Sequence, residues 1–242
     1  MDIHKPRPIH NWREFLKEYA IIVIGVLTAL GAEQAVETLH KHQRAAEARA
    51  SIRAEIAYNL GEMEVRSETE ACVTRRLDEA DALITAAAKL PQDTLWIGRP
   101  LATIGRDSLY KSASESGSVT LLDNDEQGTY ASLYRAFETY DQQQFIEQKA
   151  WADLRMLERH PPPSPAMDAL LRSAVQQARI ARWYIEAGHQ RALTAASAIG
   201  IKPAWSPRYK PQSVCLPLHT PRSEAAKLVA QGRPGHFVRD EP

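Results

Sequence analysis

The chain has 242 residues, and its 30 basic and 30 acidic side chains give a formal net charge of zero. Such a balance argues against nucleic acid as a partner, because nucleic-acid binding requires a basic excess. Hydrophobic residues make up 44% of the chain and charged residues 25%, as in an ordinary globular domain. This apolar content excludes a chain that is disordered throughout.

The first predicted element is an apolar helix near the N-terminus. The uninterrupted apolar run, Tyr19 to Ala32, has 14 residues. As a helix it spans about 21 Å, against about 30 Å of bilayer hydrocarbon. Flanking apolar residues extend its face from Phe15 to Val36, about 33 Å. Trp12 suits a membrane interface, and Lys17 can extend its ammonium group to that interface. We therefore expect a membrane-spanning helix over residues 18–40.

Two other interpretations of this segment are open. Ala29-Leu30-Gly31 would serve as the cleavage site of a secretory signal, and a run this short also fits the buried helix of a soluble protein. We favour an uncleaved anchor, because Glu14 and Glu18 are unusual upstream of a signal core. Asn11 with Glu14 also forms a capping box, which starts the helix before the apolar run.

The flanking charges predict an orientation in the membrane. Four basic residues precede the run and three follow it, namely Lys5, Arg7, Arg13 and Lys17, then Lys41, Arg44 and Arg49. By the positive-inside rule this weak bias places residues 1–17 in the cytoplasm. The expected location is a bacterial inner membrane, with a single span and the body in the periplasm.

Two stretches of the sequence carry a family resemblance. They are "HNWREFLKEYAIIVIGVLTALGAEQAVETLH", from His10 to His40, and the weaker "SLYKSASESGSVTLL…YASLY", from Ser108 to Tyr134. They resemble a group of uncharacterised bacterial proteins that begin with a "WREFLKE" segment and an "IVIGVLIALGAEQ"-like membrane helix. The resemblance implies a single-pass protein with a mostly helical body, and it supplies no activity.

The body is predicted to be an antiparallel helical bundle over residues 41–200. Apolar residues recur at helical spacing in long segments at 40–89, 125–158 and 165–199, and a short helix is expected after Asp107. The first segment is expected to kink near Gly61. Asp123 or Asn124, and Ser164, have the residue types that cap helix N-termini. The stripes predict a bundle core rather than a cofactor site, so no cofactor is expected.

Composition changes after Ile201, where seven of the fifteen prolines lie. Since proline cannot continue a helix, we expect an irregular tail over residues 201–242 that packs on the bundle, with a short helix near Ser223–Gln231. The predicted fold class is therefore all-α, with one N-terminal membrane helix that continues into the bundle.

The two cysteines, Cys72 and Cys215, lie on a predicted helix and in the tail. If the body is outside the cytoplasm, this pair predicts a disulfide that pins the tail to the bundle. The alternative is two separate buried thiols. No C-x-x-C or H-E-x-x-H pattern occurs, so neither zinc nor redox chemistry has support, and no metal is expected.

Small residues at a spacing of four occur twice in the anchor, as Gly25 with Ala29 and as Gly31 with Ala35. Such pairs allow membrane helices to approach closely. Besides membrane lipid, we therefore expect other membrane subunits, or a second copy of the chain, as partners.

Polar residues Glu33, Gln34 and Glu37 follow the apolar run. An acidic side chain at membrane depth is a candidate for ion or proton movement. The simpler interpretation, which we favour, places these residues at the interface, with Glu37 paired to Lys41 one helical turn later.

No catalytic motif is present. The segment "SESGS" (Ser114–Ser118) lacks the first glycine of a nucleophile elbow, and neither a phosphate loop nor a dinucleotide fingerprint occurs. The sequence predicts a non-enzymatic interaction protein, an accessory or scaffold subunit of an inner-membrane assembly. The alternative is a periplasmic bundle that senses a small molecule and signals through a partner protein.

Overall fold

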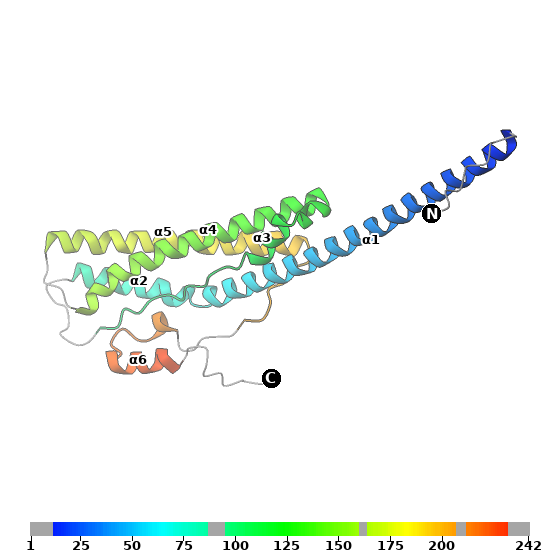
Figure 1. Cartoon of the computed structure of the whole chain (residues 1–242). Helices are drawn as coiled ribbons and strands as arrows, with labels where there is room; N and C mark the ends of the chain where they lie inside the picture. The colour runs from blue at the N-terminus through cyan, green and yellow to red at the C-terminus, as the bar shows by residue number, and fades with distance from the viewer. Residues whose placement is uncertain (1–11, 87–94, 160–163, 207–211, 232–242) are drawn as a thin grey trace, which may run out of the picture.

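The computed structural model describes residues 12–86, 95–159, 164–206 and 212–231 (Figure 1). Its elements are α1 (Trp12–Ser67), α2 (Glu70–Thr85), α3 (Ser108–Glu115), the 3-10 helix η2 (Ser118–Leu121), α4 (Asn124–Leu154), η3 (Arg155–Arg159), α5 (Pro165–Ala198), η4 (Ser213–Cys215) and α6 (Arg222–Gln231). The described residues form helices and no strands, which confirms the all-α prediction. Asn11, from the predicted capping box, lies outside these residues.

Helix α1 runs without a break from the apolar N-terminal segment into the body (Figure 1). Its 56 residues correspond to a length of about 84 Å. Residues 12–44 project from the bundle, whereas Ala45, Ile52, Ile56 and Met63 on its later turns are buried in the core. The apolar segment and the centre of the body therefore belong to one continuous helix.

The predicted single helix over residues 40–89 is wrong. Helix α1 passes through Gly61 and ends at Ser67. After a turn at residues 68–69, the separate helix α2 begins at Glu70 and ends at Thr85.

Gly61 marks the point where the C-terminal tail crosses α1. A Cβ atom at this position would collide with the carbonyl oxygen of Ala204. The N–H of Ala204 in turn donates a hydrogen bond of 2.8 Å to the carbonyl oxygen of Ala57. The glycine is therefore explained by the close approach of another segment.

Helices α4 and α5 are long and antiparallel, and they pack against each other alongside α1 and α2 (Figure 1). Their N-termini carry the predicted caps. Asp123 accepts a hydrogen bond of 2.8 Å from the N–H of Glu126, and Ser164 accepts one of 3.2 Å from the N–H of Met167. Helix α4 ends at Leu154 and continues as η3, so its last turn is tighter than predicted.

Residues 95–107 form a segment without regular secondary structure, here called the extended segment, in which Gly98 has a positive φ of 67°, and the segment runs beside α4 (Figure 1). Side-chain amides make the hydrogen bonds to this backbone that a neighbouring strand would otherwise make. Gln144 accepts from the N–H of Thr103 at 2.8 Å and donates to its carbonyl at 2.5 Å. Asn59 makes the same two bonds with Arg106, both at 2.8 Å. Because unpaired backbone groups are costly to bury, these amides hold the segment in place.

The described part of the tail, residues 201–206 and 212–231, lies against the body. The backbone N–H of Trp96 donates to Leu218 at 2.7 Å, and its indole N–H donates to Ser213 at 2.9 Å. Helix α6 adds Ala225 to a small apolar cluster with Trp96. The tail and the extended segment therefore support each other on one side of the bundle.

Candidate functional site

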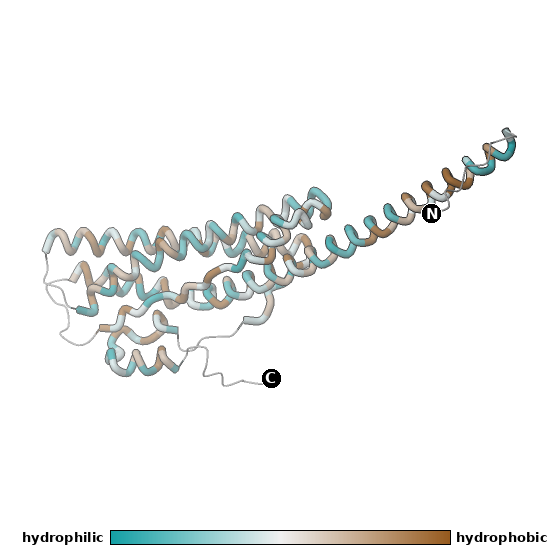
Figure 2. The backbone as a smooth tube through the Cα atoms, in the orientation of Figure 1, coloured by the Kyte–Doolittle hydropathy of each residue, from teal (hydrophilic) through white to brown (hydrophobic). Residues whose placement is uncertain are grey.

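Residues 12–44 of α1 form an exposed helix with a strongly apolar stretch that follows its hydrophilic first turns (Figure 2). None of these residues is buried within the chain, and the exposed fraction of Trp12 is 71%. The helix is long and apolar enough to span a membrane. A soluble core helix would be covered by its own domain, so the structure does not support that interpretation of the segment.

The two predicted packing notches lie open on this helix. A Cβ atom placed on Gly25 or Gly31 would meet no atom within 4 Å. Ala29 and Ala35 are exposed. No other described segment fills either notch, and their use in helix packing stays a prediction.

Glu33 and Gln34 are exposed in the part of the helix that precedes the body. Glu37 forms an ion pair of 2.7 Å with Lys41, the pairing expected from their spacing. This contact agrees with the simpler interpretation, in which the acidic residues belong to the end of the apolar segment.

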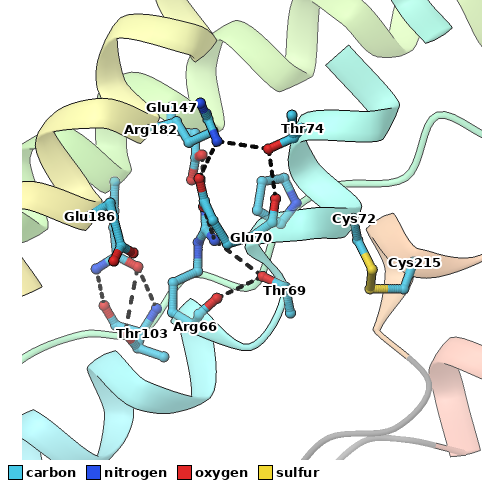
Figure 3. A network of polar contacts seen from close by, with 12 residues as sticks. Arg66, Thr69, Glu70, Cys72, Thr74, Thr103, Glu147, Arg182, Glu186 and Cys215 are labelled. Carbon is cyan, nitrogen blue, oxygen red and sulfur yellow. Dashed lines mark hydrogen bonds and ion pairs between the residues drawn. A yellow bond between two sulfur atoms is a disulfide. The ribbon is translucent and has the colours of Figure 1, made fainter. Parts of the chain in front are cut away.

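Cys72 on α2 and Cys215 in η4 are joined by a disulfide with an S–S distance of 2.05 Å (Figure 3). The predicted pairing is thereby confirmed. The two residues are 143 positions apart, and closing so long a loop is worth up to about 4–5 kcal/mol in the chain-entropy model. The bond fixes the tail to α2.

Arg76, one turn after Cys72, strengthens the same junction, a role that no sequence pattern indicated. Its buried guanidinium donates to the carbonyl oxygens of Trp96, Ile97 and Leu216, the Ile97 bond being 2.6 Å. An ion pair with Glu79 at 2.7 Å balances its charge. One side chain thus holds α2, the extended segment and the tail together.

A layer of charged side chains crosses the interior of the bundle (Figure 3). The Arg66 guanidinium on α1 and the Glu147 carboxylate on α4 lie 2.7 Å apart, and their side chains are 1% and 0% exposed. Arg182 on α5 extends the layer through an ion pair with Glu70 and a bond of 2.7 Å to Thr74. Four helices therefore meet at buried or half-buried charges, a feature that we did not predict.

This polar layer separates two apolar clusters of the core. On α4, Glu147 lies between Tyr140, which belongs to the cluster around α1 and α3, and Ala150, which belongs to the cluster around α2. On α5, Arg182 likewise lies between residues of the two clusters. The layer coincides with the break between α1 and α2.

Burial shifts the pKa of two titrating groups in the body of the protein, Glu147 in the layer and His189 further along α5. Burial raises the pKa of the Glu147 carboxyl above its ordinary value, although the Arg66 guanidinium opposes that rise. Burial lowers the pKa of His189 on α5, whose ring nitrogens have no hydrogen-bond partner among the described residues. Burial therefore disfavours the charged form of both groups, and the Arg66 guanidinium offsets part of this effect at Glu147.

A pocket of about 650 Å³ lies between α3 and α4. Its wall carries charges of both signs and three aromatic rings, namely Arg106, Lys111, Arg135, Asp107, Glu138 and Asp141 with Tyr110, Tyr134 and Phe137. The rings of Tyr110 and Tyr134 stack at 4.2 Å. Tyr110 and Tyr134 lie near the two ends of the segment Ser108–Tyr134, so the two ends of this segment meet at the pocket.

Glu55 on α1 fixes the inner edge of this pocket. Its buried carboxylate accepts bonds of 3.0 and 3.1 Å from the N–H groups of Leu109 and Tyr110 in the first turn of α3. The hydroxyl of Tyr134 donates to it at 2.6 Å. A carboxylate is favoured here because the N-terminus of a helix carries partial positive charge.

No cluster of His, Cys, Asp and Glu side chains suited to a metal occurs among the residues that the structure describes. Comparisons with protein families, with curated proteins and with solved structures find no match to this chain. Its function is therefore inferred from the exposed apolar helix, the bundle and the surfaces described above.

Proposed function

We propose that this protein is a membrane-anchored, non-enzymatic subunit that acts as an accessory or scaffold component of a bacterial inner-membrane assembly. The observation that carries the proposal is the continuity of α1. Residues 12–44 are uncovered and the later turns form the centre of the body. A body that shares its central helix with the anchor is held in a fixed relation to the bilayer.

The interval between the apolar segment and the body is short. Leu39, the last large apolar residue of the exposed segment, precedes the buried Ala45 by six residues, or about 9 Å of helix. Just beyond Ala45, polar contacts join the first turn of α4 and the end of α5 to α1. Arg49 pairs with Glu126 at 2.7 Å, and Arg53 donates to the carbonyl oxygen of Ile199, at the end of α5, at 2.9 Å. Insertion of α1 would therefore place this end of the bundle at the membrane surface.

Two features support a cytoplasmic N-terminus and a periplasmic body. Basic residues are slightly more numerous before the apolar run than after it. The Cys72–Cys215 disulfide suits an oxidising compartment, since thiols in the cytosol are kept reduced.

The anchor is tested by charged substitutions within the apolar run. The paired change Ile24→Arg and Leu27→Arg costs about 2.5–3.5 kcal/mol per residue at the centre of a membrane helix. We expect this variant to leave the membrane fraction in alkaline carbonate, whereas wild type and the exposed body variant Ala54→Arg remain in it. Equal extraction of all three proteins would contradict the proposal.

The scaffold role is tested by copurification from a mild detergent. A C-terminally tagged chain at native expression is expected to retain a defined set of inner-membrane proteins, and the paired arginine variant is expected to lose them. A wild-type protein that elutes without partners would contradict the role.

A second candidate function, a small-molecule sensor, is favoured by the pocket between α3 and α4. Its aromatic and charged wall offers contacts for a ligand, and Glu55 links α3 directly to α1. A ligand there would act on the helix that reaches the membrane. Small-molecule screening by thermal shift tests this function, with Phe137→Ala expected to abolish any shift that wild type gives.

A further inference from the structure

Asp141 on α4 places a half-buried carboxylate in the wall of the pocket between α3 and α4. The N–H of Gly105 donates to its two oxygens at 3.3 and 3.2 Å, and the side-chain amide of Gln144 donates to it at 3.3 Å. Both donors are neutral, and no cationic side chain among the described residues forms an ion pair with Asp141. Burial raises the pKa of this carboxyl, the two donors oppose that rise, and the nearby Asp107 adds to it. A positive charge beside the carboxylate would therefore stabilise its ionised form.

The cationic side chains that line the same pocket do not supply this charge. The Lys111 ammonium pairs with Asp107 at 2.6 Å, and the Arg106 guanidinium lies 3.6 Å from the centre of the Tyr58 ring on α1. Arg135, the third cation of the wall, is exposed and precedes the carboxylate by six positions, about 1.7 turns of α4. The two side chains therefore leave the helix in directions about 120° apart, and the counter-ion has to come from a ligand.

Aromatic rings line the pocket beside this carboxylate. Tyr134, Phe137 and Asp141 follow one another at spacings of three and four along α4, so they share one face of the helix. The rings of Tyr134 and Phe137 meet edge to face at 5.7 Å, and Tyr110 of α3 stacks on Tyr134 at 4.2 Å. The face of an aromatic ring attracts a cation and also packs against an apolar group. One pocket thus combines a carboxylate that lacks a counter-ion with rings that suit a cation.

We propose that this pocket binds an organic cation, a small amine whose ammonium group contacts Asp141 and whose apolar part lies against Tyr110 and Phe137. The inference rests on the second candidate function, the sensor, and names the chemical class of its ligand. The pocket volume of about 650 Å³ lies within the range of about 300–1,000 Å³ that is usual for small-molecule sites. The ligand would also lie beside Gly105, in the extended segment that Asn59 joins to α1 by two hydrogen bonds.

Isothermal titration calorimetry of the full chain in detergent, with empty micelles as the blank, tests the ligand class. The probes are benzylamine, benzyl alcohol and benzoate, which share one ring and differ in charge. We expect benzylamine to bind wild type at least about tenfold more tightly than the other two, because only its ammonium group pairs with the carboxylate. Asp141→Asn should weaken benzylamine binding at least about tenfold. The asparagine oxygen can still accept from the Gly105 N–H, so the extended segment should remain in place.

The matched control is Asp153→Asn, the same change on α4 about 18 Å further along the helix and outside the pocket wall, and it should leave benzylamine binding unchanged. Equal affinity for the three probes, no binding of benzylamine, or an affinity for benzylamine that Asp141→Asn does not reduce overturns the proposal. The comparison of probes on wild type does not depend on the folding of any variant. A neutral or anionic probe whose binding Phe137→Ala abolishes would contradict the amine class and keep the sensor function, whereas a thermal-shift screen that finds no ligand of any class contradicts the sensor itself.

Discussion

Arg66 of α1 and Glu147 of α4 form an ion pair of 2.7 Å inside the bundle, where their side chains are 1% and 0% exposed. Arg66 also donates to the hydroxyl of Thr69 at 3.1 Å, in the turn that separates α1 from α2. The pair thus joins α1, the helix with the exposed apolar segment, to the α4–α5 side of the body, at the point where the apolar core is interrupted.

Removal of one partner of this pair should destabilise the protein strongly. Glu147→Leu leaves the Arg66 guanidinium buried without its main counter-ion, and we expect a loss of about 3–5 kcal/mol in the free energy of unfolding. The double variant Arg66→Met, Glu147→Leu should lose less than the single variant, because no charge remains unpaired. Urea unfolding in detergent measures both.

The matched control is the exposed pair of Asp168 and Arg172, which lie 2.9 Å apart on the surface of α5. Arg172→Ala should change the free energy of unfolding by less than about 0.5 kcal/mol. Similar losses in the free energy of unfolding from Glu147→Leu and Arg172→Ala would show that the buried ion pair stabilises the fold no more than an exposed one.

Stability should also fall as the medium becomes acidic. Burial lowers the pKa of His189 in the folded state, below its ordinary value of 6.5, although Glu186 and Glu64 oppose the shift. As pH falls below that value, the unfolded state binds more protons than the folded state, so the free energy of unfolding decreases. His189→Gln should have a shallower decline between about pH 7 and pH 5.5. Parallel curves for the two proteins would exclude His189 as the cause.

Gly61→Ala should weaken the contact between the tail and α1. The new methyl group would collide with the Ala204 carbonyl, at an expected cost of about 1–3 kcal/mol. Hydrogen exchange at the Ala204 amide should become faster, since its bond to Ala57 would be disturbed. Gly128→Ala is the control, because Gly128 lies in α4 with nothing within 4 Å, and there alanine should stabilise by up to about 1 kcal/mol.

Loss of the disulfide should release the tail without unfolding the bundle. The double variant Cys72→Ser, Cys215→Ser is expected to lose about 2–5 kcal/mol of stability. Limited proteolysis should then cut first within residues 201–231, and a reducing agent should reproduce this pattern in wild type but change nothing in the variant. A tail that remains resistant would mean that Arg76 and the backbone contacts of Trp96 suffice to hold it.

Much of the fold was predictable from local patterns. Helix caps and apolar stripes depend on interactions within a few positions, so they can be recognised from a single sequence. This holds for the caps Asp123 and Ser164 and for the stripes on α4 and α5. The cysteine pair was predictable from its even number and the inferred export. The exposed apolar segment of α1 was visible as an uninterrupted apolar run.

Other features depend on distant contacts and had no local signal. The break after Ser67 contains neither proline nor glycine, and Thr69 is held there by Arg66 and by the core. The side chain of Arg66 follows Met63 by three positions and so continues a buried stripe, which was the one available hint of a polar layer. Gly61 suggests a kink when only its neighbours in the sequence are considered, because the segment that requires it, at Ala204, is distant in the chain.

The most direct test of an anchored periplasmic bundle is the position of the body relative to the membrane. Protease added to intact spheroplasts should digest the chain beyond about His40 and leave an N-terminal fragment that remains with the membrane. The untreated protein should begin at its own N-terminus. A body that is protected until the spheroplasts are lysed, or a mature chain that begins at Ala32, would contradict the claim that α1 anchors a periplasmic bundle.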